Sequence, residues 1–296
     1  MKLAEMRHRL SEVVLNQPEL VKSVTSTIHR HLYNIDTNFE FHTSNSLLII
    51  GDTGTGKTFS VKELAKLVDL PFIEINAKSI CQEGWDGVSL VKLIENGMKS
   101  IHYDQNDLYD YPIIFIDEID KLIAPLASSS NANYSEHLQA SLLKYIEGMK
   151  VRLNKINMDT SQFCFIFAGA FSGLFDEDDK QSIGFTGAKE EKDLVKALER
   201  FGALPEFLGR ITRTVQTRSL IDNDFRDLLL SPSLKLNLMF RDAEAKGFDS
   251  PVLNYSYLIA EATRRKLGYR GLNQLLEPYI DELLETMDSQ KISAKM

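Results

Sequence analysis

The stretch "SLLIIGDTGTGKT" at residues 46–58 decides the fold of this chain. It begins as an unbroken apolar run, which is typical of a strand buried on both faces. A loop with three glycines follows, and then a pattern with Val61, Leu64, Ala65 and Val68 on one helical face. The loop fits G-x-x-x-x-G-K-[ST] between a strand and a helix, which is the context that this phosphate-binding motif requires.

Glycines let the loop backbone fold closely around phosphate oxygens, while its N–H groups and the helix N-terminus supply positive potential. We expect Lys57 to reach the β- and γ-phosphates of a nucleotide and Thr58 to ligate Mg²⁺. A glycine-rich turn without a ligand is the alternative interpretation. The residues that we expect to contact the nucleotide here are Gly51, Asp52, Thr53, Gly54, Thr55, Gly56, Lys57, Thr58 and Phe59.

A second apolar run, "IIFIDE" at residues 113–118, ends in two adjacent acids. Asp117 at the end of a neighbouring strand would hold Mg²⁺, and Glu118 would orient and deprotonate the attacking water. Nucleotide binding needs only the first acid, so the pair indicates hydrolysis. The alternative is that Glu118 is a solvated acid at a strand end.

Further buried strands are predicted at residues 71–76, 111–120 and 162–171, with helices between them. This alternation predicts an α/β fold with a parallel sheet covered on both faces by helices. Residues 1–45 are predicted to be helical with a break at 16–18, and the polar stretch 127–135 is predicted to be a mobile loop. Beyond residue 215 no strong strand pattern follows. We therefore expect a large domain at 1–215 and a small helical domain at 216–296, whose longest helix carries Pro278.

The net charge of −8 argues against bulk attraction to nucleic acid or to anionic lipid. The two cysteines, Cys81 and Cys164, lie in unrelated contexts and support neither a disulfide scaffold nor a four-cysteine zinc site. No apolar run approaches the roughly 20 residues that span a bilayer. These features predict a soluble, cytoplasmic protein without a membrane partner.

The motifs and their order resemble the AAA+ ATPases of the ClpX/HslU clade. The resemblance covers residues 13–287. The segments that carry it are the opening stretch "SLLIIGDTGTGKT" and then "IIFIDEIDK", "LLKYIEG", "FIFAGAFSGL", "FGALPEFLGR" and "GYRGLNQLLE". It implies a large P-loop AAA+ domain with a small, mostly helical domain, which hydrolyses ATP with Mg²⁺ and assembles as a homohexameric ring. By this resemblance we expect the family's N-terminal zinc domain to be absent.

The same resemblance implies roles for further residues. Arg210 in "PEFLGR" matches the arginine finger that reaches a nucleotide bound by the neighbouring subunit, and Arg270 in "GYRGL" matches the sensor-2 arginine. Val14 and Leu15 match the segment beside adenine. The alternative for both arginines is an ordinary solvated position at a helix end. A polar sensor-1 side chain is missing around "FAGAF", which predicts slow hydrolysis.

The resemblance also implies loops that handle protein substrates. Gly84, Trp85, Asp86 and Gly87 match the pore loop that grips polypeptide, and Ile183, Gly184 and Phe185 match the tripeptide that docks on the ClpP peptidase. The stretch 127–135 sits where the second pore loop belongs, and the alternative for it is a solvated connection. Residues 149–162 stand where the family has its pore-entrance loop, but they are fewer and lack its Arg-Lys-His signature. A turn packed against its own domain is the alternative for the first two segments.

The implied function is an ATP-dependent unfoldase or translocase that threads protein substrates through a central pore, with a ClpP-type peptidase as candidate partner. Two alternatives stay open. The chain could remodel one dedicated protein complex without a peptidase, or it could be a DNA-associated or regulatory assembly ATPase.

Overall fold

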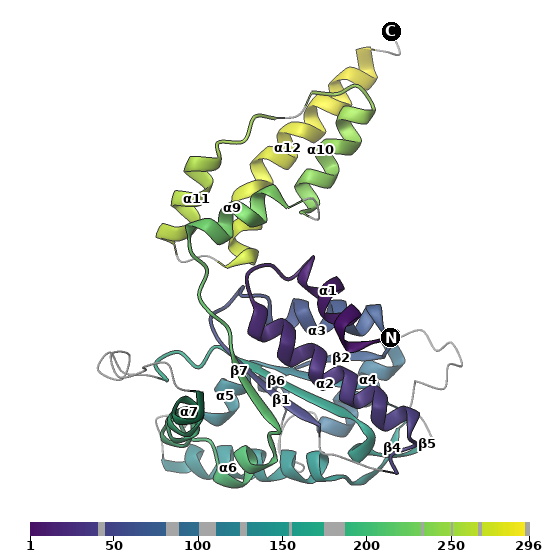
Figure 1. Cartoon of the computed structure of the whole chain (residues 1–296), viewed down its shortest axis with the longest axis vertical. Coiled ribbons are helices and arrows are strands. Elements are labelled where there is room, and N and C mark those ends of the chain that lie inside the picture. Colours follow the sequence, from purple (N-terminus) through teal and green to yellow (C-terminus); the bar gives the residue numbers. More distant parts are fainter. Residues whose placement is uncertain are drawn as a thin grey trace. The chain divides into compact units, whose positions relative to one another are not determined.

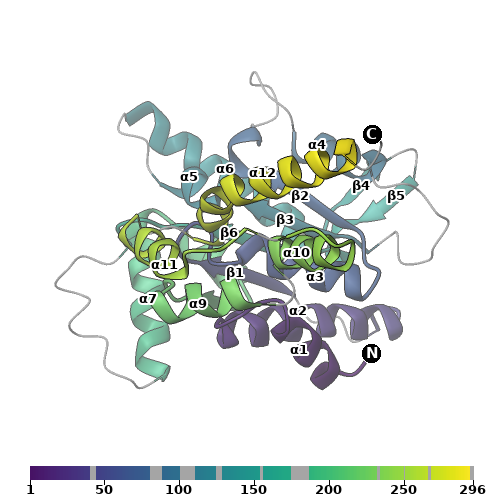
Figure 2. The same cartoon turned by 90° about the horizontal axis from the view of Figure 1, so that it is seen from above.

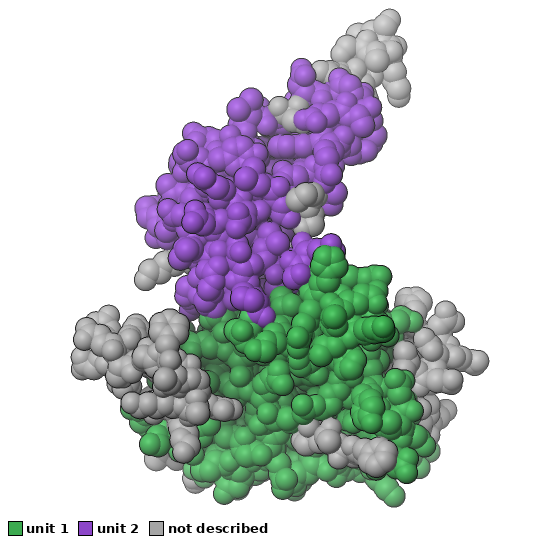
Figure 3. All heavy atoms as spheres, in the orientation of Figure 1, with its two compact units in different colours: residues 1–10, 19–51, 57–217 green, residues 11–18, 52–56, 218–296 purple. Residues whose placement is uncertain are grey.

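A computed structural model describes residues 1–40, 45–80, 89–100, 111–124, 129–153, 156–174, 187–231, 234–249, 251–265 and 268–293 of the chain. These residues form two compact units (Figure 3). Unit 1 comprises residues 1–10, 19–51 and 57–217. Unit 2 comprises residues 11–18, 52–56 and 218–296, so the tip of the glycine loop groups with the C-terminal helices.

A parallel five-stranded sheet forms the centre of unit 1 (Figure 1). Its order is β2-β3-β6-β1-β7, and every neighbouring pair is parallel. The strands are β1 (Ser46–Ile50), β2 (Phe72–Asn76), β3 (Ile113–Asp117), β6 (Cys164–Gly169) and β7 (Arg213–Gln216). The predicted α/β fold class is confirmed. Since parallel strands end at one edge, the segments after β1, β2, β3 and β6 meet there.

Helices cover both faces of this sheet (Figures 1 and 2). The helices around it are α1 (Leu3–Ser11), α2 (Pro18–Asp36), α3 (Lys57–Leu67), α4 (Leu90–Ser100), α5 (Ile119–Ile123), α6 (Ser129–Glu147), α7 (Gly187–Phe201) and α8 (Pro205–Arg210). Short 3₁₀ turns lie at Ala77–Ser79 and Thr160–Gln162. The predicted break at 16–18 separates α1 from α2.

Alternate residues of the strands build the larger core cluster of unit 1. Ile116 on β3 and Phe167 on β6 are both fully buried, together with residues from α4, α5, α6, α7 and α8. Phe167 stacks on Phe165 at a ring distance of 6.3 Å and meets Phe207 of α8 edge-on at 5.3 Å. This packing fixes the positions at which β3 and β6 end, since a well-packed interior transmits displacement.

Three sequence predictions need correction. The polar stretch at 127–135 is not a loop over its described part, because α6 already begins at Ser129. Ser135 lies inside this helix, and its buried hydroxyl donates to the carbonyls of Leu122 and Ile123 in α5. Residues 149–162 contain an antiparallel hairpin, β4 (Lys150–Leu153) and β5 (Ile156–Asp159), rather than only a loop. Strand β7 was missed, because its sequence is mixed and polar, as suits its place at the edge of the sheet that the structure describes.

Over its described residues beyond 218, unit 2 forms the helices α9 (Asp222–Leu230), α10 (Lys235–Ala245), α11 (Tyr255–Arg264) and α12 (Tyr269–Ser293). Leu258, Leu272 and Leu276 are buried in its apolar core. Pro278 lies within α12, which continues through it. Among the described residues, no helix combines the length and the apolar character that a membrane crossing requires.

A buried histidine in unit 1 makes folding stability sensitive to acid. His31 of α2 is 1% exposed, and its Nε2 lies 2.9 Å from the carbonyl oxygen of Tyr111. Burial lowers the pKa of His31 from 6.5 to about 4. The unfolded chain therefore binds a proton near pH 6.5 that the folded unit accepts only near pH 4.

We expect the free energy of unfolding to fall by about 3 kcal/mol through His31 as the pH drops from 6.5 to 4. Denaturant unfolding of the parent and of His31→Gln, measured at several pH values between 7 and 4, checks this. The glutamine can still donate to Tyr111 but cannot charge, so the parent should lose more stability over this interval. Parallel pH curves for the two proteins would contradict the prediction.

Candidate active site

Four of the predicted residues meet at the carboxyl edge of the sheet in unit 1. Lys57 and Thr58 begin α3, while Asp117 and Glu118 stand at the end of β3. The Thr58 hydroxyl donates to Oδ2 of Asp117 at 3.3 Å, and Oδ1 of Asp117 accepts the backbone N–H of Glu118 at 2.8 Å. The edge thus brings together a hydroxyl, two carboxylates and an ammonium group.

Lys57 is 8% exposed, although a lysine is rarely buried without a partner. Its Nζ donates to the carbonyl oxygen of Gly51 at 2.6 Å. Gly51 ends the strand side of the loop and Lys57 begins the helix side, so this bond ties the two sides together. The ammonium group is held at the loop that the sequence assigns to phosphate.

Glu118 has an unusual backbone, with φ 57° and ψ 33°, in the left-handed region. Its carboxylate is 42% exposed and is held by Lys78 at 2.8 Å and by Nδ2 of Asn76 at 3.2 Å. The hydrogen bonds from Lys78 and then Asn76 lower the pKa of Glu118 below its usual value. Glu118 is therefore ionised at neutral pH, as a general base must be.

Sequence reasoning missed Asn76 and Lys78. Asn76 is the last residue of β2 and is in register with Asp117 on the neighbouring strand, and Lys78 lies in the 3₁₀ turn that follows. The signal for them was available, because polar side chains at the end of a predicted strand and just after it must reach the same edge as the acids at the end of β3.

A buried carboxylate lies where the sequence offered no polar sensor-1 side chain. Asp120 of α5 is 1% exposed, and its Oδ1 accepts the backbone N–H of Ala170, just after β6, at 3.3 Å. Its Oδ2 pairs with the ammonium of Lys121 at 2.9 Å. Asp120 thus holds the end of β6, which lies between β1 and β3 in the sheet.

The tip of the glycine loop, residues 52–56, is held within unit 2. Ser219 donates to Oδ2 of Asp52 at 2.6 Å, and the backbone N–H of Tyr269 donates to the carbonyl of Gly54 at 2.8 Å. A Cβ built on Gly56 would lie 3.9 Å from Cγ1 of Val14, which is buried.

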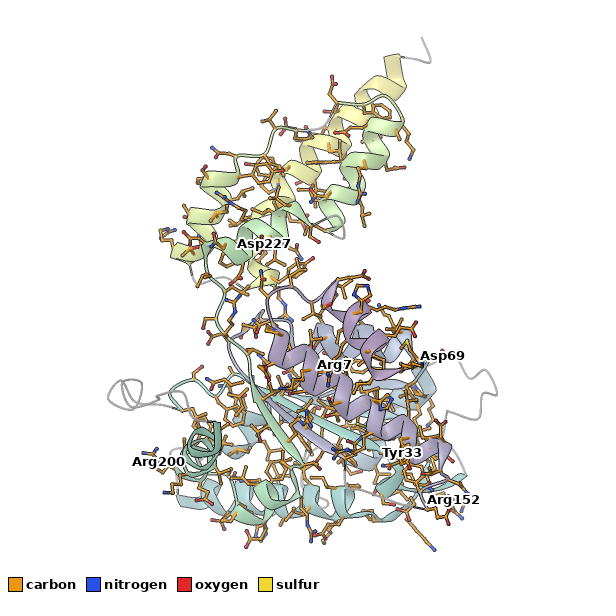
Figure 4. The ribbon with its side chains drawn as sticks, viewed as in Figure 1. Arg7, Tyr33, Asp69, Arg152, Arg200 and Asp227 are labelled. Atoms are coloured by element: carbon orange, nitrogen blue, oxygen red, sulfur yellow. The ribbon has the colours of Figure 1, made fainter. Side chains whose placement is uncertain are left out.

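The segment that contains Val14 and Leu15 is anchored in the same unit. The Gln17 amide makes two bonds to the backbone of Arg218, at 2.8 and 3.1 Å. Asn16 donates to Asp227 of α9, which is labelled in Figure 4, at 2.9 Å. Leu15 is half-buried. Contact of Val14 and Leu15 with adenine stays a prediction.

Arg210 is not at the carboxyl edge of its own sheet. Its backbone carbonyl accepts the hydroxyl of Ser46, the first residue of β1, at 2.6 Å. The glycine loop follows the other end of β1, roughly 13 Å away at the usual rise of a strand. The exposed Arg210 guanidinium pairs with Glu147 of α6 at 2.5 Å.

Arg270 lies exposed in the first turn of α12, in unit 2. The predicted pore residues 84–87 and docking residues 183–185 lie outside the described residues. Arg152 is exposed on strand β4 of the hairpin (Figure 4).

Comparison with known proteins identifies the class to which this arrangement belongs. The sequence profile of the AAA domain (Cdc48 subfamily) matches residues 42–214, more than half of the chain. That range contains the whole sheet with its loop and both acids, apart from the last two residues of β7. The chain belongs to the AAA family, and it is an ATPase.

Within this class the chain is ClpX-like. It is 24% identical to the ATP-dependent Clp protease ATP-binding subunit ClpX of Porphyromonas gingivalis, over 97% of this chain and 78% of the relative. The corresponding protein of Bacteroides fragilis is also 24% identical, over 98% and 78%. ClpX 3 of Methylococcus capsulatus is 27% identical, over 97% and 76%.

Proposed function

We propose that this chain is the subunit of a hexameric ring that hydrolyses ATP to unfold and translocate protein substrates. The observation that carries the proposal is the cluster of Thr58, Asp117 and Glu118 beside the glycine loop. An AAA fold alone would fit nucleotide binding, whereas the ionised Glu118 next to Asp117 supplies a base for hydrolysis.

The loop N–H groups and Lys57 would bind the phosphates of ATP. The Thr58 hydroxyl and the Asp117 carboxylate are hard oxygen donors 3.3 Å apart, a donor set that suits Mg²⁺. When bound, Mg²⁺ neutralises charge on the phosphate oxygens. Glu118 would accept the proton of the attacking water, after its carboxylate leaves Lys78 and Asn76. Asp120 would keep the end of β6 in place beside the reacting groups.

Arg210 would act on the nucleotide of the neighbouring subunit. Its backbone lies at the amino end of β1, so its side chain is poorly placed for the nucleotide of its own chain. An arginine supplied across an interface stabilises the charge of phosphoryl transfer, and a head-to-tail interface of this kind closes into a ring. Arg270 would contact the nucleotide from α12.

The action on protein substrates rests on the likeness to ClpX. Trp85, between Gly84 and Gly87, would grip the polypeptide, and Ile183 to Phe185 would dock on a ClpP-type peptidase. A large aromatic ring offers contact area that does not depend on substrate sequence. Remodelling of one dedicated complex without a peptidase differs from this proposal only in the partner.

The test is ATP-dependent unfolding of a stably folded fluorescent reporter that carries an unstructured tail. We expect the parent to abolish the fluorescence with ATP, and Trp85→Ala to lower the unfolding rate about tenfold or more while it retains ATP hydrolysis. Tyr33→Ala, which removes a 53% exposed aromatic from α2, is the matched control and should unfold the reporter at the parental rate.

A parent that hydrolyses ATP but never unfolds a tailed reporter, with or without a ClpP ring, contradicts the proposed function. Salt-dependent stimulation of hydrolysis by DNA would instead favour a DNA-associated ATPase. Degradation that requires added ClpP and is lost when residues 183–185 are deleted would identify the peptidase as partner.

A further inference from the structure

Two glycines from distant parts of the sequence meet inside unit 2. Gly54 lies at the tip of the glycine loop, and Gly268 directly precedes α12. A Cβ built on Gly268 would lie 2.4 Å from Cα of Gly54 and 2.4 Å from the carbonyl oxygen of Thr53. A Cβ built on Gly54 would lie 2.6 Å from Cα of Gly268. The two backbones therefore touch at a distance that excludes any side chain.

Position 268 requires glycine because the backbone of the glycine loop lies so close to it. Gly54 has a φ of +81°, which by itself favours glycine. Gly268 does not lie in the left-handed region. Its own backbone would accept an alanine, and only the neighbouring loop backbone excludes one.

The contact also pairs a hydrogen-bond donor of α12 with an acceptor of the loop. The first N–H groups of a helix have no acceptor within the helix. In α12 the N–H of Tyr269 donates to the Gly54 carbonyl at 2.8 Å, while Leu272 N–H donates to the Gly268 carbonyl at 3.0 Å. The glycine loop thus caps α12, the longest described helix of unit 2.

This bond sets the orientation of the loop. In a planar trans peptide the carbonyl and the following N–H point in opposite directions. Because the Gly54 carbonyl is directed at α12, the N–H of Thr55 is directed away from it. Thr55 is also tied back by its hydroxyl, which donates to the Asp52 carbonyl at 2.9 Å, and Asp52 accepts from Ser219 at 2.6 Å.

We propose that the first turn of α12 is a positioning element for the phosphate-binding loop, and that Gly268 is the residue that permits it. This inference rests on the proposed nucleotide site. Unit 2 holds the phosphate-binding loop directly, through Gly54. This role is separate from any contact that Arg270 makes with nucleotide. The contact orders the loop before nucleotide arrives, and preorganisation of this kind increases affinity.

The test uses the full chain and the variant Gly268→Ala. We expect its dissociation constant for a fluorescent ATP analogue with Mg²⁺ to rise about fivefold to tenfold, the effect of losing one bond and the order that it imposes. Without nucleotide, the Tyr269 amide should lose its protection against hydrogen exchange in this variant, while the rest of α12 keeps its protection.

Gly247→Ala is the matched control. Gly247 lies after α10 with a φ of +83° and no neighbour within 4 Å, so alanine there strains the same unit without touching the loop. The Gly247→Ala variant should be less stable than the parent but should bind the ATP analogue with parental affinity. The proposal is overturned if both variants weaken binding equally, if Gly268→Ala binds like the parent, or if the parent's Tyr269 amide is unprotected. Lys57→Ala distinguishes failure of this proposal from failure of the proposed nucleotide site. If that variant bound the ATP analogue with parental affinity, the nucleotide site itself would be refuted.

Discussion

We expect Glu118→Gln to leave the protein able to bind ATP but to lower its turnover at least about 100-fold, the contribution of a positioned general base. The glutamine keeps the size of the side chain and one oxygen for Lys78 and Asn76, which hold the carboxylate in the parent. It cannot accept the proton of water. The loop, Lys57 and Thr58 are untouched, so the affinity for ATP and the assembly that ATP supports should persist.

Steady-state ATP hydrolysis and binding of a fluorescent ATP analogue, measured on the same preparation, check this result. Glu95→Gln is the matched control, because it makes the same change at a carboxylate that pairs with Lys99 on α4. It should hydrolyse ATP like the parent. If Glu118→Gln turned over ATP at the parental rate, another group would be the base and the assignment would fail.

The central strands could be predicted because each is an apolar run long enough to be buried on both faces. Strand β1 coincides with its predicted range, residues 46–50, and strands β3 and β6 lie within their predicted ranges. Strand β7 was not predicted, because Arg213 and Thr214 are only half-buried and its sequence pattern is therefore mixed. The start of α6 was not predicted for a different reason, because a polar run in a sequence is typical of a loop. The hydrogen bonds of Ser135 to α5 cannot be inferred from the spacing of residues in the sequence.

The candidate site was predictable where its residues share one motif. Lys57 and Thr58 follow β1 and its glycine loop, and Asp117 ends β3, so a local pattern locates them. Asp120 and Gly268 come from other elements, and their relation to the site exists only after the chain has folded. Gly268 is the clearest case, since nothing in its own sequence context demands a glycine and the demand comes from Gly54.

We expect Arg210→Ala to lower the turnover of the proposed ring about 1000-fold or more, the usual contribution of an arginine finger. The parental guanidinium is exposed and pairs with Glu147 at 2.5 Å, a surface contact that contributes little to stability. The fold should therefore survive the substitution. Arg200→Ala, which removes another exposed arginine from α7, should hydrolyse ATP like the parent, and so should Glu147→Ala, which releases Arg210 from its partner.

Mixing subunits decides whether Arg210 serves its own nucleotide or that of the next subunit. Arg210→Ala and Glu118→Gln subunits are each inactive alone, but a ring built from both contains sites that combine an intact Glu118 with an intact Arg210. Equal mixing before assembly should restore about a quarter of the parental rate, because both groups are intact at one interface in four of a random head-to-tail ring. An arginine that acted within its own chain would give no recovery, since every subunit lacks one of the two groups. The position of Arg210 at the amino end of β1 leads us to expect recovery.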